Sequence, residues 1–251
     1  MIKRDALTYL DLDECVLKLE KYDYTKDEMI TFIKQGKLKG EKIDNKWYVN
    51  QCDLRYFTYC IEQPEILKQA VYSGAIGVDL SQLSLNGKIL DIGGGGEGII
   101  GQLKSDEVIA IDPLKQELIE APSGPIKIVM NAKELLFLDH SFETVTSFFT
   151  LMYIKNEEHK QVFEEIYRVL KPNGHFILWD VVIPKTINNT LFIAFLEVTL
   201  PNKTVSTGYG QKRNDKTQTS DYFIDLGKEV GFQVESVEDI NNNAYCLKFT
   251  K

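Results

Sequence analysis

The sequence has few residues that bind metals and no long apolar run. Its 251 residues include four cysteines and three histidines. No two cysteines form a C-x-x-C pair, and no histidine lies near a cysteine at a spacing typical of metal sites. This pattern predicts reduced thiols and no bound metal. The longest apolar runs have the length of a strand, well short of the roughly 20 residues that cross a bilayer, so we expect no membrane partner.

The charge balance and the N-terminal residues narrow the possibilities further. The first fourteen residues, MIKRDALTYLDLDE, turn acidic where a signal peptide needs an apolar core, which predicts a cytoplasmic protein. The formal net charge is -8, whereas proteins that bind nucleic acid over a large surface carry a surplus of lysine and arginine that neutralises the phosphates. Nucleic acid is therefore an unfavoured partner, although a local basic patch remains compatible with this charge.

The most informative stretch runs from Lys88 to Gly98, with the sequence KILDIGGGGEG. Its first residues read as a short buried strand, and four consecutive glycines follow. Glycine lets a backbone turn sharply and approach a bound molecule, because it has no Cβ. Gly93, Gly95 and Gly98 satisfy G-x-G-x-x-G, a pattern of dinucleotide folds that carries little weight in so glycine-rich a loop.

From Lys88 onward, strands and helices alternate, which predicts a mostly parallel sheet. We expect strands at 89–92, 108–111, 126–130, 142–150 and 176–183, with helices at 98–104, 116–121, 157–170 and 221–229. Residues 232–237 and 245–249 are expected to form a terminal antiparallel hairpin around a turn at 241–243. The fold class is therefore α/β, with a Rossmann-like sheet.

Three other segments differ from this pattern. Residues 1–62 read as a small separate α+β domain, and residues 63–87 read as a helical linker or lid that breaks at Gly74 and Gly77. Within the main domain, 88–251, the apolar residues of about 190–210 flank Pro201-Asn202 and predict an inserted hairpin.

The N-terminal domain has the pattern helix, helix, hairpin, helix. Thr25 and Glu28 have the spacing of a capping box at the start of the second helix, and Asp44-Asn45 lies in the expected hairpin turn. This order resembles the excisionase-type winged helix-turn-helix, in which the second helix reads DNA. Basic and acidic residues nearly balance here, so we favour a structural or substrate-covering module over DNA binding.

Two aspartates flank the first helix of the main domain. Asp91 and Asp112 end adjacent predicted strands, at the edge where an open α/β sheet binds its ligand. Asp112 suits the hydroxyls of a ribose, as found in NAD and in S-adenosylmethionine alike. Asp91 at the loop entrance suits an ammonium group better than a pyrophosphate, which favours S-adenosylmethionine.

Four stretches in order resemble the successive motifs of class I S-adenosylmethionine-dependent methyltransferases: ILDIGGGGEG, VIAIDPLKQEL, NAKELLFLDHSFETV and YRVLKPNGHFIL. The resemblance covers about Lys88 to Ile183. It implies S-adenosyl-L-methionine as cofactor and a seven-stranded sheet whose last strand is inserted beside the sixth. It also implies a cofactor site made of Asp91, Gly93, Gly94, Gly95, Asp112, Pro113, Asn131, Ala132, Phe148 and Phe149.

Two positions within the four motifs depart from the family pattern. Asn131 stands where an aspartate is usual near the adenine, and its side-chain oxygen can still accept a hydrogen bond. Glu97 stands where the third glycine of the loop is usual. The resemblance places Phe148 and Phe149 at the sulfonium end of the site.

Methyl transfer from a sulfonium is a one-step displacement, so the protein mainly aligns donor and acceptor and excludes water. If a base is used, there are two candidates. The resemblance implies Tyr153, which stands after the fourth strand where relatives often carry a histidine, and Asp180 lies toward the end of the fifth strand by the same crevice. We expect His140 in an exposed loop, His159 exposed at a helix start and His175 at a strand entry.

The acceptor is predicted to be a small molecule. Residues 150–153 read TLMY, not the Asn/Asp-Pro-Pro-Tyr/Phe that grips planar amino groups. Two alternatives remain open: a DNA-binding regulator whose methyltransferase-like domain senses the cofactor, and an NAD-dependent enzyme.

Overall fold

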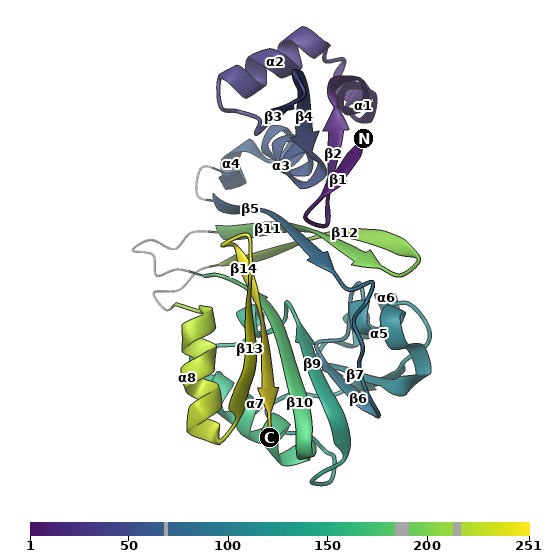
Figure 1. Ribbon diagram of the computed structural model, residues 1–251, viewed down its shortest axis with the longest axis vertical. Coiled ribbons are helices and arrows are strands. Elements are labelled where there is room, and N and C mark those ends of the chain that lie inside the picture. The colour runs from purple at the N-terminus through teal and green to yellow at the C-terminus, as the bar shows by residue number, and fades with distance from the viewer. Residues whose placement is uncertain (68–69, 184–190, 213–216) are drawn as a thin grey trace. The chain divides into compact units, whose positions relative to one another are not determined.

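The computed structural model describes residues 1–67, 70–183, 191–212 and 217–251 (Figure 1). Contacts divide the chain into two units. The first comprises Met1–Gln82 and Asn188–Asn214, and the second comprises Leu83–Ile187 and Asp215–Lys251. In the described part of the chain, no helix is both long and apolar enough to cross a membrane.

The second unit contains a mixed seven-stranded sheet in the order β13-β14-β10-β9-β6-β7-β8. The strands are β6 (Ile89–Ile92), β7 (Val108–Asp112), β8 (Ile126–Val129), β9 (Phe142–Phe148), β10 (Leu170–Val181), β13 (Gln233–Ile240) and β14 (Ala244–Thr250). Five neighbouring strands, from β10 to β8, pair in parallel, whereas β14 is antiparallel to both β10 and β13. The strand order reverses between β6 and β9, which creates a switch point at their carboxyl ends.

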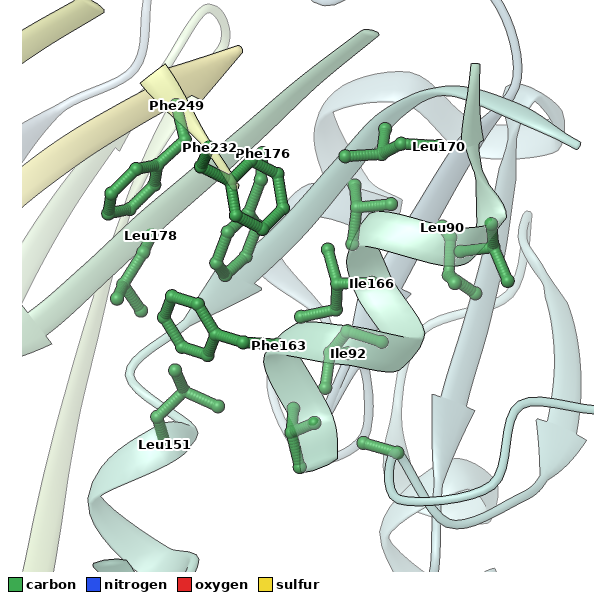
Figure 2. Packing of buried hydrophobic residues seen from close by; sticks show 14 of the residues in the cluster. Leu90, Ile92, Leu151, Phe163, Ile166, Leu170, Phe176, Leu178, Phe232 and Phe249 are labelled. Carbon is green, nitrogen blue, oxygen red and sulfur yellow. The ribbon is translucent and has the colours of Figure 1, made fainter. Parts of the chain in front are cut away.

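Among the described residues of this unit, four α-helices connect the strands. They are α5 (Ile99–Lys104), α6 (Lys115–Glu120), α7 (Asn156–Val169) and α8 (Ser220–Val230). Helix α7 places Val162, Phe163, Ile166 and Val169 in the main apolar core, as its 3.6-residue periodicity predicts. Figure 2 shows Phe163 and Ile166 projecting from this helix toward side chains of the sheet.

The structure confirms the predicted rhythm of this unit. Every strand and helix expected from residue 89 onward is present, and most boundaries shift by one to three residues. The largest difference is that β10 begins at Leu170, so it includes the Lys171–Gly174 turn that we expected to precede it. The register of β10 against β9 shifts between Leu170 and His175, which accommodates that turn.

The first unit contains two sheets. A four-stranded sheet has the order β1-β2-β4-β3, and a three-stranded sheet has the order β12-β11-β5. The strands are β1 (Ile2–Arg4), β2 (Leu7–Asp11), β3 (Glu41–Ile43), β4 (Lys46–Asn50), β5 (Ala70–Asp79), β11 (Leu191–Leu200) and β12 (Lys203–Lys212). The helices are α1 (Leu12–Lys18), α2 (Lys26–Lys34), α3 (Gln51–Glu62) and the short α4 (Pro64–Leu67), with a 3-10 turn, η1 (Glu20–Tyr22).

Several local predictions hold in this unit. Thr25 and Glu28 form the expected capping box, and Asp44 and Asn45 have the positive φ angles of a tight hairpin turn between β3 and β4. Strands β1 and β2 were missed, and the first helix starts later than expected because Leu7–Asp11 is a strand. The winged-helix resemblance stays a prediction.

The helical start predicted for residues 63–87 is present as α4, but the helical reading is wrong beyond it, because Ala70–Asp79 forms β5. The two glycines that suggested helix breaks have roles in this strand. Gly74 has a φ of 100° and lies where the register against β11 shifts, which is typical of a bulge. At Gly77, a Cβ would lie 2.2 Å from the carbonyl oxygen of Asp5, so only glycine lets the β1–β2 turn approach β5.

The hairpin expected at about 190–210 is present as β11 and β12, although residue 190 lies outside the described residues. It belongs to the first unit, together with β5, rather than to the 88–251 domain in which we placed it. The pairing of β5 with β11 is parallel and joins residues more than a hundred positions apart, so no local pattern announces it.

Candidate functional site

The candidate site lies in the second unit, where the carboxyl ends of β6, β7 and β9 meet. Ligands of open α/β sheets bind outside these ends, at the point where the strand order reverses. The segment after β6 is the glycine loop, residues 93–98, and the segment after β9 is the turn 149–153, called here the β9 turn. A Cβ on Gly93 would lie 2.3 Å from the Thr150 side chain, so the loop and the turn are in direct contact.

The glycine loop is fixed by its own backbone. The N–H groups of Gly93 and Gly94 donate to the carbonyl oxygen of Ile111 at 2.8 and 3.0 Å. Gly93 has a φ of 73°, a conformation that side-chain-bearing residues rarely adopt. A Cβ on Gly94 would lie 2.7 Å from the Ala110 Cβ and 2.8 Å from Asp91 Oδ2, so the loop has the tight approach that the sequence predicts.

Asp91 is the buried carboxylate of the site. It is 2 % exposed, and its Oδ1 accepts a hydrogen bond of 2.7 Å from the Thr146 hydroxyl on β9. Burial raises the pKa of this carboxyl to about 7, with a further contribution from the nearby charge of Asp112, while the Thr146 hydrogen bond opposes the shift. A buried carboxylate of this kind is stabilised in its charged form by a cation, which is what an ammonium group supplies.

Asp112 ends β7 on the other side of the glycine loop. It is half-buried, and the backbone N–H groups of Leu114 and Gly95 hydrogen-bond to its carboxylate. Burial raises its pKa, and these two hydrogen bonds limit that rise. A Cβ added to Gly95 would lie 3.0 Å from Asp112 Oδ2, so the carboxylate borders the glycine loop as predicted.

The neighbouring predicted residues lie near Asp112, but not all in the environment that we expected. The N–H of Met130 donates to the Asp112 carbonyl oxygen, which brings the segment after β8 to the same edge. Asn131 is exposed, and its Oδ1 accepts from the N–H of Lys133, so this oxygen already caps a turn. Ala132 is buried in the apolar core, whereas Pro113 is exposed.

The two predicted phenylalanines are buried at the end of β9. Phe148 contacts Trp179 of β10, with ring centroids 5.7 Å apart. Phe149 has a φ of 52°, which is strained for an aromatic residue, and its N–H donates to the Trp179 carbonyl oxygen. Backbone strain of this kind persists only where surrounding contacts hold it, and it is enriched at functional sites.

The two candidate bases have different surroundings. Tyr153 is 45 % exposed at the end of the β9 turn. Asp180 is fully buried, and its carboxylate accepts from the N–H groups of Met152 and Val181 at 3.0 and 2.8 Å. Burial raises its pKa to about 7, and the hydrogen bonds from the backbone oppose that shift.

Strand register shows which face each side chain occupies. Asp91, Thr146 and Ile177 are paired across β6, β9 and β10, so their side chains share one face of the sheet. Asp180, three residues after Ile177, lies on the opposite face, together with Leu178 and the core that α7 covers. Asp180 and Asp91 therefore do not face the same side, contrary to our expectation of one crevice.

Sequence reasoning missed two residues of this region. Thr146 is the partner of Asp91, and its position opposite Asp91 becomes visible only when β6 pairs with β9. His159, expected to be exposed, is completely buried between the β9 turn and α8. The prediction failed because His159 lies three residues before Val162 on α7, at the spacing of the buried face. His140 is exposed, as predicted, whereas His175 is not at the strand entry but is the sixth residue of β10, where regular pairing with β9 resumes.

The comparisons with known proteins agree with this geometry. Residues 90–178 match the family model of a methyltransferase domain. This segment contains β6, the glycine loop, β7, β9, α7 and most of β10, and therefore nearly every candidate residue named above. A search of curated proteins finds no match to the chain.

Solved structures show similar folds at low sequence identity. The PH0226 protein from Pyrococcus horikoshii OT3 is 21% identical, with 78% of this chain and 90% of that chain covered and a TM-score of 0.51. The cyclase SpnF is 13% identical, with 68% and 76% covered and a TM-score of 0.50. An S-adenosylmethionine-dependent methyltransferase from Aquifex aeolicus is 14% identical, with 65% and 81% covered and a TM-score of 0.47.

The cyclase shows that this fold by itself does not define the reaction, so the assignment depends on the family match and on the site. The two carboxylates and the glycine loop lie within the residues that the family model matches. Residues 90–178 are thus similar to a methyltransferase domain, in a chain whose α/β fold resembles those of the solved structures, and these findings support S-adenosylmethionine as its cofactor.

Proposed function

We propose that this protein transfers a methyl group from S-adenosylmethionine to a small-molecule acceptor by direct displacement. The observation that carries the proposal is the buried Asp91 carboxylate beside a glycine-rich loop, with Asp112 on the far side of that loop. A pyrophosphate would be repelled by this arrangement, whereas an ammonium group and a ribose would be bound by it.

Each part of the site has a distinct task. Asp91 binds the ammonium group, Asp112 accepts hydrogen bonds from the ribose hydroxyls, and the glycine backbone allows close approach. Phe148 and Trp179 form an apolar wall that excludes water. The cofactor, when bound, supplies an activated methyl group, so alignment matters more than acid–base chemistry.

A small acceptor is favoured by the β9 turn. Its Thr-Leu-Met-Tyr sequence lacks the paired prolines and leading amide that hold a planar amino group. A methyl group labelled with tritium in the donor should therefore appear in the small-molecule fraction of a cell extract incubated with the protein. Label found only in protein or nucleic acid would reject the small-molecule acceptor while leaving methyl transfer intact.

Asp112→Ala tests the cofactor site directly. The substitution removes charge-assisted hydrogen bonds to the ribose, so the affinity for S-adenosylhomocysteine should fall by about 1–3 kcal/mol. Isothermal titration calorimetry measures it. The control is Asp106→Ala, which removes the same charge from an exposed residue of the short turn η2 (Ser105–Glu107) and should leave affinity unchanged. Equal affinity in the wild type and Asp112→Ala would refute the role of Asp112, and tighter binding of NAD than of S-adenosylhomocysteine would refute the proposed function.

A further inference from the structure

The β9 turn is held by buried side chains rather than by its own backbone alone. It starts with the strained Phe149, and it contacts the glycine loop through Thr150. Such a turn needs restraints, because a left-handed conformation costs roughly 1–2 kcal/mol for a residue with a side chain. The restraints come from α7 and β10.

A single peptide group of the turn is bound from two directions. Its carbonyl, that of Leu151, lies 3.0 Å from His159 Nε2, and its N–H, that of Met152, donates to Asp180 Oδ2 at 3.0 Å. His159 and Asp180 are both completely buried. Because the two side chains come from different elements, the peptide group cannot rotate without breaking both contacts.

The hydrogen-bond partners of His159 define its tautomer. A carbonyl oxygen only accepts, so Nε2 must carry the proton that binds Leu151. In the neutral imidazole, Nδ1 accepts from the hydroxyl of Tyr222 on α8, at 3.0 Å, and the Asn156 carbonyl oxygen, 3.3 Å from the same hydroxyl, competes for its proton. Burial lowers the pKa of His159, which favours this neutral form. The chain of contacts thus runs from α8 through His159 to the β9 turn.

We propose that His159 and Asp180 are positioning residues that hold the Leu151–Met152 peptide, and with it the β9 turn, against the glycine loop of the cofactor site. This inference rests on the proposed function, because the turn forms one wall of the site that the glycine loop borders. In this proposal Asp180 positions the Met152 N–H and does not transfer a proton. It also explains why a polar pair is buried on the face of the sheet that α7 covers.

The sharpest test compares two amides at the same position. In His159→Gln, the terminal NH₂ reaches as far as Nε2 and can still donate to the Leu151 carbonyl. In His159→Asn, the amide is one methylene shorter and reaches only the position of Nδ1. Both variants bury one neutral amide, so they differ mainly in the contact with the turn.

Hydrogen exchange in the free protein and calorimetry with S-adenosylhomocysteine provide the two measurements. The amides of Met152, Tyr153 and Ile154 are all hydrogen-bonded and report on the turn. His159→Asn should raise their exchange at least about tenfold, leave the amides of α7 beyond Val162 unchanged, and weaken ligand binding about tenfold. In His159→Gln, both the exchange rates of these amides and the affinity for S-adenosylhomocysteine should remain within about threefold of the wild type.

Several outcomes would overturn the proposal. Unchanged exchange in His159→Asn would show that the contact does not hold the turn, and faster exchange with unchanged affinity would show that the turn does not support the site. Faster exchange throughout the unit would indicate a purely structural histidine. If His159→Asn does not fold, Tyr222→Phe removes the hydroxyl that orients His159 while keeping the ring, and it should show the same local effect at about threefold. Failure of the wild type to bind S-adenosylhomocysteine would reject the proposed function, whereas the exchange result is independent of it.

Discussion

The glycine loop and the β9 turn lie against each other at one edge of the same sheet, yet they are built by different means. The loop follows its path because five of its six residues have no side chain, and its backbone N–H groups donate to the Ile111 carbonyl oxygen. The β9 turn follows a strained path with bulky residues such as Phe149, and buried side chains of other elements hold it. A loop of the first kind is recognisable in a sequence, whereas a turn of the second kind depends on partners that are distant in the chain.

The strongest test of this contrast adds a side chain to the glycine loop. In Gly94→Val, the new Cβ would collide with Ala110 and with Asp91 Oδ2, so we expect affinity for S-adenosylhomocysteine to fall by more than about a hundredfold. The matched control is Gly210→Val in β12, where a Cβ meets no atom closer than 3.8 Å and a β-branched residue suits the strand. Calorimetry gives the affinities and thermal unfolding shows whether each variant folds. Wild-type affinity in Gly94→Val would remove the argument that the loop needs glycine.

The second test uses two buried carboxyls: Asp91, beside the glycine loop, and Asp180, which binds the β9 turn. The pKa of Asp91 and that of Asp180 are raised to about 7, whereas an aspartate in the unfolded chain titrates near 4. The folded protein therefore holds these protons more tightly, so their stabilising contribution is complete below about pH 4 and is lost as pH rises toward 7. Each carboxyl changes the free energy of unfolding by up to about 1.4 kcal/mol per pH unit within this window.

Ligand binding should separate the two contributions. An ammonium group beside Asp91 favours the charged form of this carboxyl, so S-adenosylhomocysteine should bind more tightly as pH rises through 7. Bound ligand should therefore reduce the loss of unfolding free energy with rising pH that Asp91 causes. The part due to Asp180 should persist with ligand and disappear in Asp180→Asn. Urea unfolding at pH 5, 6, 7 and 8, with and without ligand, measures both. A stability that rises with pH across this range would contradict the assignment of both carboxyls.

The smallest expected effect concerns the hydrogen bond between the two central strands. Thr146→Val removes the hydroxyl that donates to Asp91, so the pKa of Asp91 should rise further. Affinity for S-adenosylhomocysteine at pH 7 should fall by on the order of 1 kcal/mol, and the pH at which binding strengthens should move upward. Thr144→Val is the matched control, because Thr144 lies two residues earlier on β9 and donates to the Asn86 carbonyl oxygen instead. Identical pH profiles for both variants would show that Thr146 has no specific effect on Asp91.

Much of the second unit could be predicted from the sequence because its signals are local. Alternating short apolar strands and amphipathic helices define the sheet, and glycines after a strand define the ligand loop. Asp91 and Asp112 could be placed at one edge, because the carboxyl ends of parallel strands meet there. The first unit was harder, since Gly74 and Gly77 indicate helix breaks in isolation but serve a bulge and a close contact in β5.

The sequence by itself determined the α/β rhythm, the glycine loop and the two carboxylates that flank it, since each depends on residues within a few positions of one another. Only the tertiary structure decided three other features: β5 pairs with β11, Asp180 faces away from Asp91, and His159 is buried against the β9 turn. The physical reason is that these features depend on strand register and on packing between elements far apart in the chain. Local periodicity gives the type of an element, but it does not specify which neighbour that element meets.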